Sequence, residues 1–378
     1  MRSPEKNRQA VVTWLTITGI VLLILLALTG CVNRLFIPDG TVIYPEITPV
    51  AGDTGTLDPA RTFSFEGTPV TLQVPVDAAV YSGAENADRD ITIYGNVSES
   101  VWVTGAYTHI MDDPAQEPFY RNLTGALRSV RASRSLDDDE YLELMAAFTQ
   151  SLQYEIRNRT DPKFPVETYV DGSGDCDDKT LLLAGLLSRE GYRVALFLFG
   201  PESHMAVGIA DGTSAYKDTG YAYLETTAPS LVGIPPDSLR GNVTLTSQPV
   251  VIPIGNGTKL YTGTDQARYI RATLKKADAR VEELEGEIAR QQVSLSAEKA
   301  ALDRENQDLS GLLAKGQYSQ YNAGVIRYNS GVAVYNRNLD SFRALNQEYN
   351  RMAEIHNYII THLSDRKGTY QWVLARQP

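Results

Sequence analysis

The chain has 378 residues, of which 43% are hydrophobic and 21% are charged. This length and composition predict globular domains with proper cores and argue against global disorder. The formal net charge of -11 and the lack of a basic stripe argue against a nucleic-acid-binding protein.

The first expected element is a membrane segment at residues 11–30. It contains an uncharged run of 19 residues from Val11 to Thr29, which at about 1.5 Å per residue can cross a bilayer core of about 30 Å. Basic residues precede the run, so the positive-inside rule places residues 1–10 in the cytoplasm and the remainder outside. The residues before Cys31 also resemble a lipobox, in which Cys31 is lipidated and the preceding segment is removed. We therefore expect a chain held at the cell membrane by a transmembrane helix or by a lipid.

Two segments are expected before the core. Residues 31–61 are rich in proline and glycine, which predicts a linker that lifts the following domain off the membrane. Residues 62–135 contain short runs typical of β-strands, separated by turn residues, and predict a β-rich lead-in. The expected strands are Phe63–Phe65, Val70–Val76, Ile91–Tyr94 and Val101–Tyr107.

A core domain is expected over residues 136–262. The acids from Asp137 to Glu140 open a helix, where the helix dipole favours them, and apolar residues at helical spacing continue to Ile156. After a glycine-rich turn, a second apolar run at helical spacing predicts a helix that begins at Cys176 and is capped by Gly191.

The thiol of Cys176 is subject to two opposing effects. At a helix start it faces unpaired backbone N–H groups and the positive end of the helix dipole, which favour the thiolate. The neighbouring carboxylates of Asp175, Asp177 and Asp178 stabilise the helix start but oppose thiolate formation, because they are anions. The sequence leaves the balance between them open.

Three strands are expected after this helix: Val194–Phe199, His204–Ala210 and Tyr221–Thr227. If His204 pairs with Glu225, the turn between the last two strands centres on a segment rich in glycine and aspartate, as a hairpin requires. Directly paired residues project from the same face of a sheet, so the two side chains are expected to touch.

Long helices are expected over residues 263–365, as a coiled coil or helical hairpin, followed by a tail at 366–378. A loose apolar heptad comes first, with Val281, Leu284, Ile288, Leu295, Leu302, Leu309 and Leu312. A regular aromatic heptad follows, with Tyr321, Tyr328, Tyr335, Phe342 and Tyr349, and a second seam position is expected at Val325, Val332, Leu339, Ala353 and Ile360. Gly311 and Gly316 weaken helix between the two halves, which predicts a hairpin or a break. We interpret the tyrosines as packing residues with hydroxyls at the rim.

Cys176, His204 and Glu225 supply the residue types of a cysteine nucleophile, its base and the acid that orients the base. The alternative is a buried structural cysteine, a strand histidine and a surface glutamate. Gln150 precedes the nucleophile, and its amide could donate a hydrogen bond to an oxyanion, although an amide on an amphipathic helix is often only solvated. Glu167 and Asp178 are expected to brace the turn before Cys176.

At these residues the sequence resembles the transglutaminase-like superfamily, and in particular its microbial, membrane-anchored branch of largely unknown function. The motifs lie between residues 62 and 239 and include Phe148–Tyr154, Pro165–Thr168, Gly172–Asp178, His204–Gly208 and Tyr221–Thr227. The resemblance implies an α+β fold whose papain-like core packs the cysteine helix on an antiparallel sheet. It also implies that Cys176 is the nucleophile, His204 the base and Glu225 the orienting acid. Many members have aspartate at the third position, so the longer glutamate departs from that pattern.

The implied reaction is attack of the thiolate on a carboxamide or peptide carbonyl to give a thioester, which water hydrolyses or an amine cross-links. The sequence does not choose between these outcomes. We expect no cofactor and no metal. The candidate site offers one cysteine and one histidine, which are too few for a structural zinc. His356 and His362 are not at the spacing that places two residues on the same face of a helix. The expected partners are a protein or peptide substrate, the membrane, and a second copy or another protein at the coiled coil. The alternative function is a non-catalytic binding or scaffold module.

Overall fold

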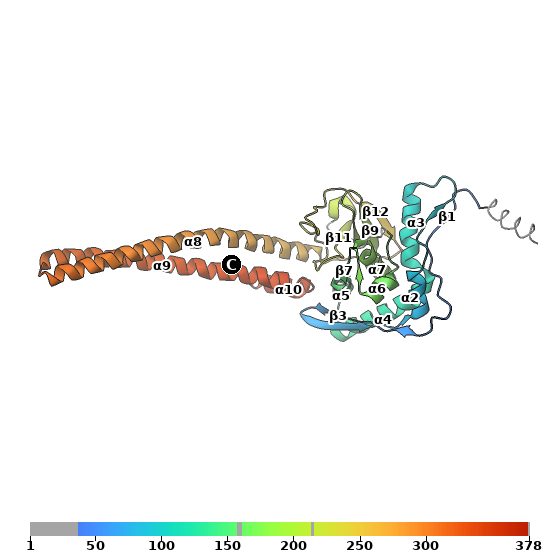
Figure 1. Ribbon diagram of the computed structural model, residues 1–378, viewed down its shortest axis with the longest axis horizontal. Coiled ribbons are helices and arrows are strands. Elements are labelled where there is room, and N and C mark those ends of the chain that lie inside the picture. The colour runs from blue at the N-terminus through green and yellow to red at the C-terminus, as the bar shows by residue number, and fades with distance from the viewer. Residues whose placement is uncertain (1–36, 157–160, 213–214, 377–378) are drawn as a thin grey trace, which may run out of the picture.

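The computed structural model describes residues 37–156, 161–212 and 215–376, which form a globular core and a long helical hairpin that projects from it (Figure 1). The expected membrane segment at 11–30 and Cys31 lie outside the described residues. Within the described ranges, no helix combines the length and the apolar composition needed to cross a membrane.

The N-terminal part of the core consists of small antiparallel strand pairs and three helices. The β3–β4 hairpin turns at Glu66 and Gly67, whose φ values of 50° and 69° are those of a tight two-residue hairpin turn. Strand β2 pairs with β5 and β1 pairs with β6. The elements are β1 (Val42–Ile43), β2 (Thr56–Leu57), β3 (Ala60–Phe65), β4 (Thr68–Gln73), β5 (Val76–Asp77), α2 (Ala78–Glu85), β6 (Thr92–Ile93), α3 (Glu99–Asp112), the short 3-10 helix η1 (Pro114–Gln116) and α4 (Glu117–Arg134).

The expected strand at Val101–Tyr107 is wrong, because these residues belong to α3. Their β-branched and aromatic side chains favour a strand locally, but helix α3 as a whole buries Ala106, Ile110 and Met111 and packs against α7. Tertiary packing of this helix overrides local propensity. The expected β-rich lead-in is therefore partly helical, since α4 also lies within it.

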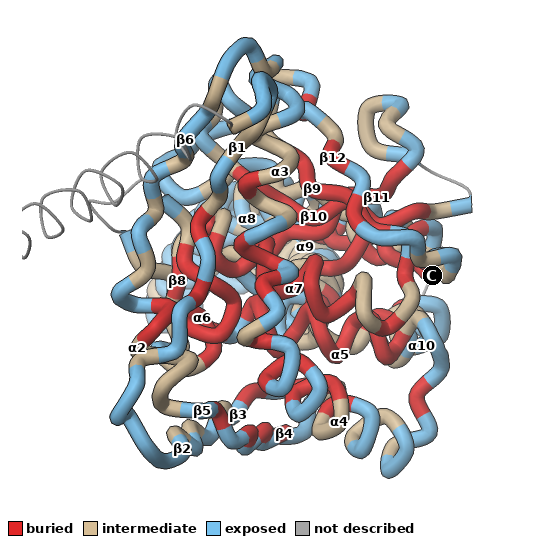
Figure 2. The backbone as a smooth tube through the Cα atoms, turned by 90° about the vertical axis from the view of Figure 1, so that its right-hand side faces the viewer, coloured by how far each residue is buried: buried red, intermediate tan, exposed pale blue. Residues whose placement is uncertain are grey.

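The centre of the core is one helix on a four-stranded antiparallel sheet, and the fold is α+β, as expected. Helix α7 (Cys176–Arg189) packs against β10 and β9 and is flanked by α5 (Asp138–Ser151) and α6 (Pro165–Asp171). The sheet has the order β11 (Tyr221–Leu224), β10 (His204–Ala210), β9 (Val194–Phe199), β12 (Val250–Ile254). Figure 2 shows that the buried chain is concentrated where α7 meets these strands. The predictions that Cys176 begins a helix and that strands cover 194–199 and 204–210 are confirmed.

The helix expected to reach Ile156 ends at Ser151. Gln153 and Tyr154 instead form β7, which pairs in parallel with β8 (Ser173–Gly174) just before Cys176. This pairing joins the end of α5 to the turn that precedes α7.

The expected hairpin register between β10 and β11 is wrong by two residues. Val207 pairs with Leu224, whereas the expected register pairs it with Ala222. Strand β11 also ends at Leu224, before Thr227, and the connection contains a 3-10 turn, η2 (Tyr216–Asp218). A shift of two residues keeps every side chain on its face of the sheet, so His204 and Glu225 still face each other.

The C-terminal region is an antiparallel hairpin of α8 (Thr264–Ala314) and α9 (Tyr318–Thr361). The 51 residues of α8 extend about 75 Å at about 1.5 Å per residue. The hairpin reverses at Gly316, whose φ of 70° lies in the left-handed region. Ion pairs such as that between Arg280 and Glu348 cross between the two helices.

The closest packing in the hairpin joins leucines of α8 to glycines of α9. A Cβ added to Gly324 would lie 2.6 Å from Leu309, and one added to Gly331 would lie 2.9 Å from Leu302. The sequence predicts the second seam at Val325, Val332 and their heptad partners. This seam lies one residue earlier in the chain, at Gly324 and Gly331. The tyrosines are half-buried, and the hydroxyl of Tyr349 reaches Glu285 at the rim, as expected.

Residues 366–378, expected to be a tail, contain helix α10 (Arg366–Leu374), which packs on the base of the hairpin. Glu143 of α5 accepts hydrogen bonds from the hydroxyl of Tyr261 at 2.6 Å and from Nε of Arg366 at 2.5 Å. Both charged side chains are buried. This ion pair fastens the hairpin to the core.

Replacing Arg366 with methionine is expected to lower the free energy of unfolding by about 3–5 kcal/mol, because it leaves the buried Glu143 carboxylate without its cation. Urea unfolding of the purified protein measures the change. The matched control is Lys367→Met, whose half-exposed ammonium pairs with Asp137 and Glu140 and should contribute less than about 1 kcal/mol, because the ammonium itself stays in contact with water. Equal losses in the two variants would contradict the assignment.

Candidate active site

The first turn of α7 is fixed by a reciprocal cap that holds Cys176 in place. The side chain of Asp175 accepts from the backbone N–H of Asp178, and the side chain of Asp178 accepts from that of Asp175 at 3.0 Å. This satisfies N–H groups that a helix start leaves unpaired. Cys176 is therefore the first helical residue, and only 8% of it is exposed.

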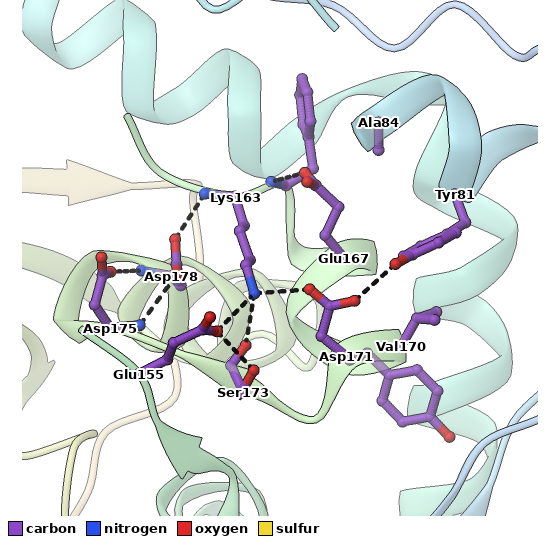
Figure 3. A network of polar contacts seen from close by, with 12 residues as sticks. Tyr81, Ala84, Glu155, Lys163, Glu167, Val170, Asp171, Ser173, Asp175 and Asp178 are labelled. Carbon is purple, nitrogen blue, oxygen red and sulfur yellow. Dashed lines mark hydrogen bonds and ion pairs between the residues drawn. The ribbon is translucent and has the colours of Figure 1, made fainter. Parts of the chain in front are cut away.

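A buried lysine braces the turn that leads to this cap (Figure 3). Nζ of Lys163 donates to Asp171 at 2.7 Å, to Glu155 at 3.2 Å and to the carbonyl of Ser173 at 3.3 Å. The backbone N–H of Lys163 donates to Asp178 at 2.6 Å. The lysine thus ties β7, the glycine-rich turn and the start of α7 together.

The thiol of Cys176 donates to Oδ1 of Asp177 at 3.1 Å. Burial raises the pKa of Cys176, and the adjacent Asp177 carboxylate raises it further, while a hydrogen bond from the backbone N–H of Met205 opposes them. In this arrangement, burial and the neighbouring carboxylate therefore outweigh the backbone N–H groups at the helix start, and the neutral thiol is favoured over the thiolate.

His204 lies at the start of β10 with its Nε2 directed at two oxygen atoms. Nε2 is 3.3 Å from Oε2 of Glu225 and 3.2 Å from the hydroxyl of Tyr223. The Tyr223 hydroxyl itself donates to Oε2 of Glu225 at 2.5 Å, so both oxygens near Nε2 are acceptors. Nε2 is then the protonated ring nitrogen of the neutral histidine, and Nδ1 carries the lone pair.

Glu225 is a buried carboxylate with a complete set of donors. Its Oε1 accepts from the backbone N–H groups of Thr226 and Thr227 and from the Thr227 hydroxyl, at 2.7–2.9 Å. Burial alone would raise the pKa of Glu225, but the hydrogen bonds from His204, Tyr223 and Thr227 outweigh it and lower the pKa to about 2. The carboxylate therefore stays ionised, and its contribution to stability is lost only as the pH falls from its unfolded pKa toward 2.

Two cavities adjoin this cluster. The larger, of about 520 Å³, is lined by Cys176, Asp177 and His204, and the smaller, of about 240 Å³, is lined by His204, Glu225 and Arg240. Tyr154, Ser203 and His204 line both, so the two cavities adjoin at these residues. Sγ of Cys176 is 4.0 Å from the carbonyl oxygen of Ser203, the residue before His204. Cys176 and His204 make no direct hydrogen bond, but they share the larger cavity.

The expected site residues have different positions relative to this cluster. The structure brings Cys176, His204 and Glu225 together, whereas Gln150 has another role. Its amide nitrogen donates to the carbonyls of Glu225 at 2.8 Å and Ser230 at 3.2 Å, so it anchors the segment after β11, and Gln150 is not among the described residues that line the two cavities.

The bracing role expected of Asp178 at the turn before Cys176 is confirmed, whereas Glu167 braces the start of α6 instead. Glu167 accepts from the backbone N–H of Phe164 and from Arg89, and Asp178 forms the cap of α7. Both carboxylates are buried and committed to the local structure.

Sequence reasoning missed two residues that complete the site. Tyr223 lies two residues before Glu225, and this spacing along a strand places both side chains on one face, a signal present in the sequence. Lys179 is fully buried one turn after Cys176, and its Nζ donates to the carbonyls of Gln150 and Leu152 at the end of α5. Burial lowers the pKa of Lys179 to about 8. In the sequence Lys179 stands between Asp178 and Thr180, as a surface lysine could, so nothing there signals this contact.

Among the residues that the structure describes, no group of three or more histidine, cysteine, aspartate or glutamate side chains is arranged to hold a metal ion. No family model, curated protein or solved structure shows significant similarity to the chain. The site is therefore interpreted from its own geometry.

Replacing Lys163 with methionine removes the ammonium shared by Asp171 and Glu155. We expect the free energy of unfolding to fall by about 1–3 kcal/mol, because the partly exposed carboxylates of Asp171 and Glu155 and the carbonyl of Ser173 lose a charged donor. Urea unfolding measures this, with Lys276→Met on the exposed side of α8 as the control. An unchanged midpoint in Lys163→Met would show that the network does not stabilise the turn.

Replacing Asp177 with asparagine removes the negative charge beside the thiol. The pKa of Cys176 should then fall by about 1 unit or more, because a neighbouring anion disfavours the thiolate. The midpoint of the alkylation rate against pH reports this pKa, measured in the full chain carrying Cys31→Ser so that Cys176 is the sole thiol. Asp53→Asn, an exposed site, is the control. A midpoint that rises or stays fixed would refute this effect of Asp177.

Proposed function

We propose that the protein is a membrane-anchored, extracytoplasmic cysteine enzyme of transglutaminase-like type that acts on amide or peptide carbonyls through a thioester. The observation that carries the proposal is the orientation of His204. Its Nε2 is engaged by Glu225 and Tyr223, so the Nδ1 lone pair is the one that remains to take a proton. This is the tautomer that a general base needs.

The papain-like character of the core belongs to the same proposal. The helix that begins at Cys176 packs on the antiparallel sheet whose strand β10 begins at His204, and Glu225 directly follows β11. Nucleophile, base and orienting acid thus come from one helix and two neighbouring strands. The longer glutamate fits here, since its Oε1 is filled by Thr226 and Thr227 while Oε2 reaches His204.

In the proposed reaction, the thiol turns from Asp177 and transfers its proton to Nδ1 of His204. The sulfur attacks the substrate carbonyl carbon, the C–N bond breaks, and the imidazolium returns the proton to the departing amine. Glu225 stabilises the imidazolium while it carries the proton. Water or a second amine then resolves the thioester, which gives hydrolysis or transfer.

The anchor and the hairpin complete the proposal. The uncharged run at residues 11–29, or a lipid on Cys31, holds the chain at the membrane with the core outside the cytoplasm. The hairpin of α8 and α9 extends from the core and offers a surface for a second copy or another protein.

One observation favours the alternative, a non-catalytic binding or scaffold module on the same fold. Cys176 is 8% exposed, and burial together with Asp177 raises its pKa, which keeps the thiol neutral. A retained but inactive site would have these properties. The behaviour of His204 separates the two functions, because only an enzyme uses it as a base.

Alkylation of Cys176 by iodoacetamide, followed from pH 4 to 10 in the full chain carrying Cys31→Ser, tests the proposal. His204→Ala is expected to slow alkylation at pH 7 by about 10-fold or more, because the thiol loses its general base. His109→Ala, on α3, is the matched control. A rate that does not depend on His204, with a midpoint at or above the reference of about 8.5, would support the scaffold function instead.

A further inference from the structure

The smaller cavity beside His204 contains an arginine that the proposed reaction does not use. Arg240 lies on the turn between Leu239 and Val243, which is closed by a hydrogen bond of 2.7 Å from the Leu239 N–H to the Val243 carbonyl. Gly241 and Asn242 have φ values of 79° and 60°, so two left-handed residues reverse the chain there. The turn carries Arg240 to the wall of the cavity.

The guanidinium of Arg240 has an aromatic neighbour but no acidic partner. It lies 5.2 Å from the ring centroid of Tyr154, the residue that lines both cavities. No carboxylate of the described residues is within ion-pair distance of it. A guanidinium stacked on a ring keeps its N–H groups at the edge of its plane, where they can bind a carboxylate with two parallel hydrogen bonds.

The acids of the smaller cavity are already committed to other donors. Glu202 accepts from Thr246 and Ser247 through both backbone N–H groups and both hydroxyls. Glu225 accepts from His204, Tyr223, Thr226 and Thr227. Both side chains remain anions, but these donors occupy their oxygens, so among the described lining residues Arg240 is the cation available to a ligand.

The larger cavity is the more acidic of the two. Asp175 and Asp177 line it beside Cys176, and no lysine or arginine is among its described lining residues, whereas the smaller cavity combines Glu202 and Glu225 with Arg240. An anionic group of a substrate is disfavoured in the larger cavity and favoured beside Arg240. The two cavities therefore differ in how well they accept an anionic group, and this difference favours one orientation of a bound substrate.

The chemistry assigns a role to each cavity. His204 must return its proton to the departing amine, so the amine part of the substrate lies next to His204. The smaller cavity is lined by His204 but not by Cys176. The bond that breaks lies where Cys176 and His204 meet, so the smaller cavity is assigned to the part of the substrate that extends past His204 on the amine side. The acyl part remains in the larger cavity with the sulfur.

We propose that Arg240 binds a carboxylate on the amine part of the substrate, such as the free C-terminus of a peptide or the carboxylate of an amino-acid acceptor. This inference rests on the proposed function, since it takes the thioester reaction as given. It makes the substrate class an amide whose nitrogen side ends in an anion one or a few residues beyond the bond that breaks. Arg240 is then a specificity-determining residue and takes no part in proton transfer.

A series of chloroacetyl peptides tests this in the full chain carrying Cys31→Ser. Chloroacetyl-glycine, chloroacetyl-diglycine and chloroacetyl-triglycine are each used as the free acid and as the C-terminal amide. The Cys176 sulfur displaces chloride from the methylene carbon, His204 takes the thiol proton, and the glycines extend along the side from which an amine would leave. Mass spectrometry measures kinact/KI for each probe.

At one length, the acid is expected to react about 10- to 100-fold faster than its amide, because charge-assisted hydrogen bonds contribute about this factor. Arg240→Gln should bring the ratio to about 1, and Arg240→Lys should give an intermediate ratio, because it keeps the charge but loses the paired geometry. Arg343→Gln, an exposed arginine on α9, is the matched control and should keep the wild-type ratio.

The failures of the two proposals are distinguishable. Equal rates for acid and amide at all three lengths, or a preference that survives in Arg240→Gln, would overturn the role of Arg240 and leave the cysteine chemistry intact. If no probe labels Cys176 in the folded protein while all label it after unfolding, the proposed function falls, and the inference falls with it.

Discussion

The position of the Cys176 thiol depends on one constraint, the reciprocal cap between Asp175 and Asp178. This cap fixes the residue at which α7 begins. The backbone N–H of Lys163 donates to Asp178 and so holds the cap in place. The Lys163 ammonium secures the preceding turn through Asp171 and Ser173. Without a fixed first turn, the sulfur would have no defined position relative to β10. The candidate site is therefore built on a helix start that is satisfied before any substrate enters.

The same acidity that stabilises this helix start makes the thiol less reactive. The positive end of the α7 dipole stabilises the carboxylates of Asp175 and Asp177. Because these carboxylates lie beside the Cys176 sulfur, they disfavour a negative charge on it. The opposite arrangement holds at Glu225, where buried donors keep a carboxylate ionised. The site thus combines a neutral thiol with a charged acid. Proton transfer through His204 is the step that would link the two.

The features predicted correctly from the sequence depend on neighbours along the chain. The start of α7 and the extents of β9 and β10 follow from capping residues and apolar runs, and the shared face of His204 and Glu225 follows from strand periodicity. One error is local, since the connection between β10 and β11 contains a 3-10 turn that the expected hairpin does not include. The others involve distant contacts: Val101–Tyr107 belongs to a helix that packs on α7, and the expected tail contains a helix whose Arg366 reaches Glu143. Local propensity contains no information on such partners.

Helix α5 connects the hairpin to the site, which argues against treating the hairpin as a separate appendage. Glu143 binds Arg366 of α10, and Gln150, two turns later on the same face, holds the carbonyl of Glu225. One small cavity is lined by all three of Glu143, Gln150 and Arg366. Glu225 and the base of the hairpin are thus both held by α5. Any rearrangement that displaced α10 from the core would act on this element, whereas the far end of the hairpin has no such contact.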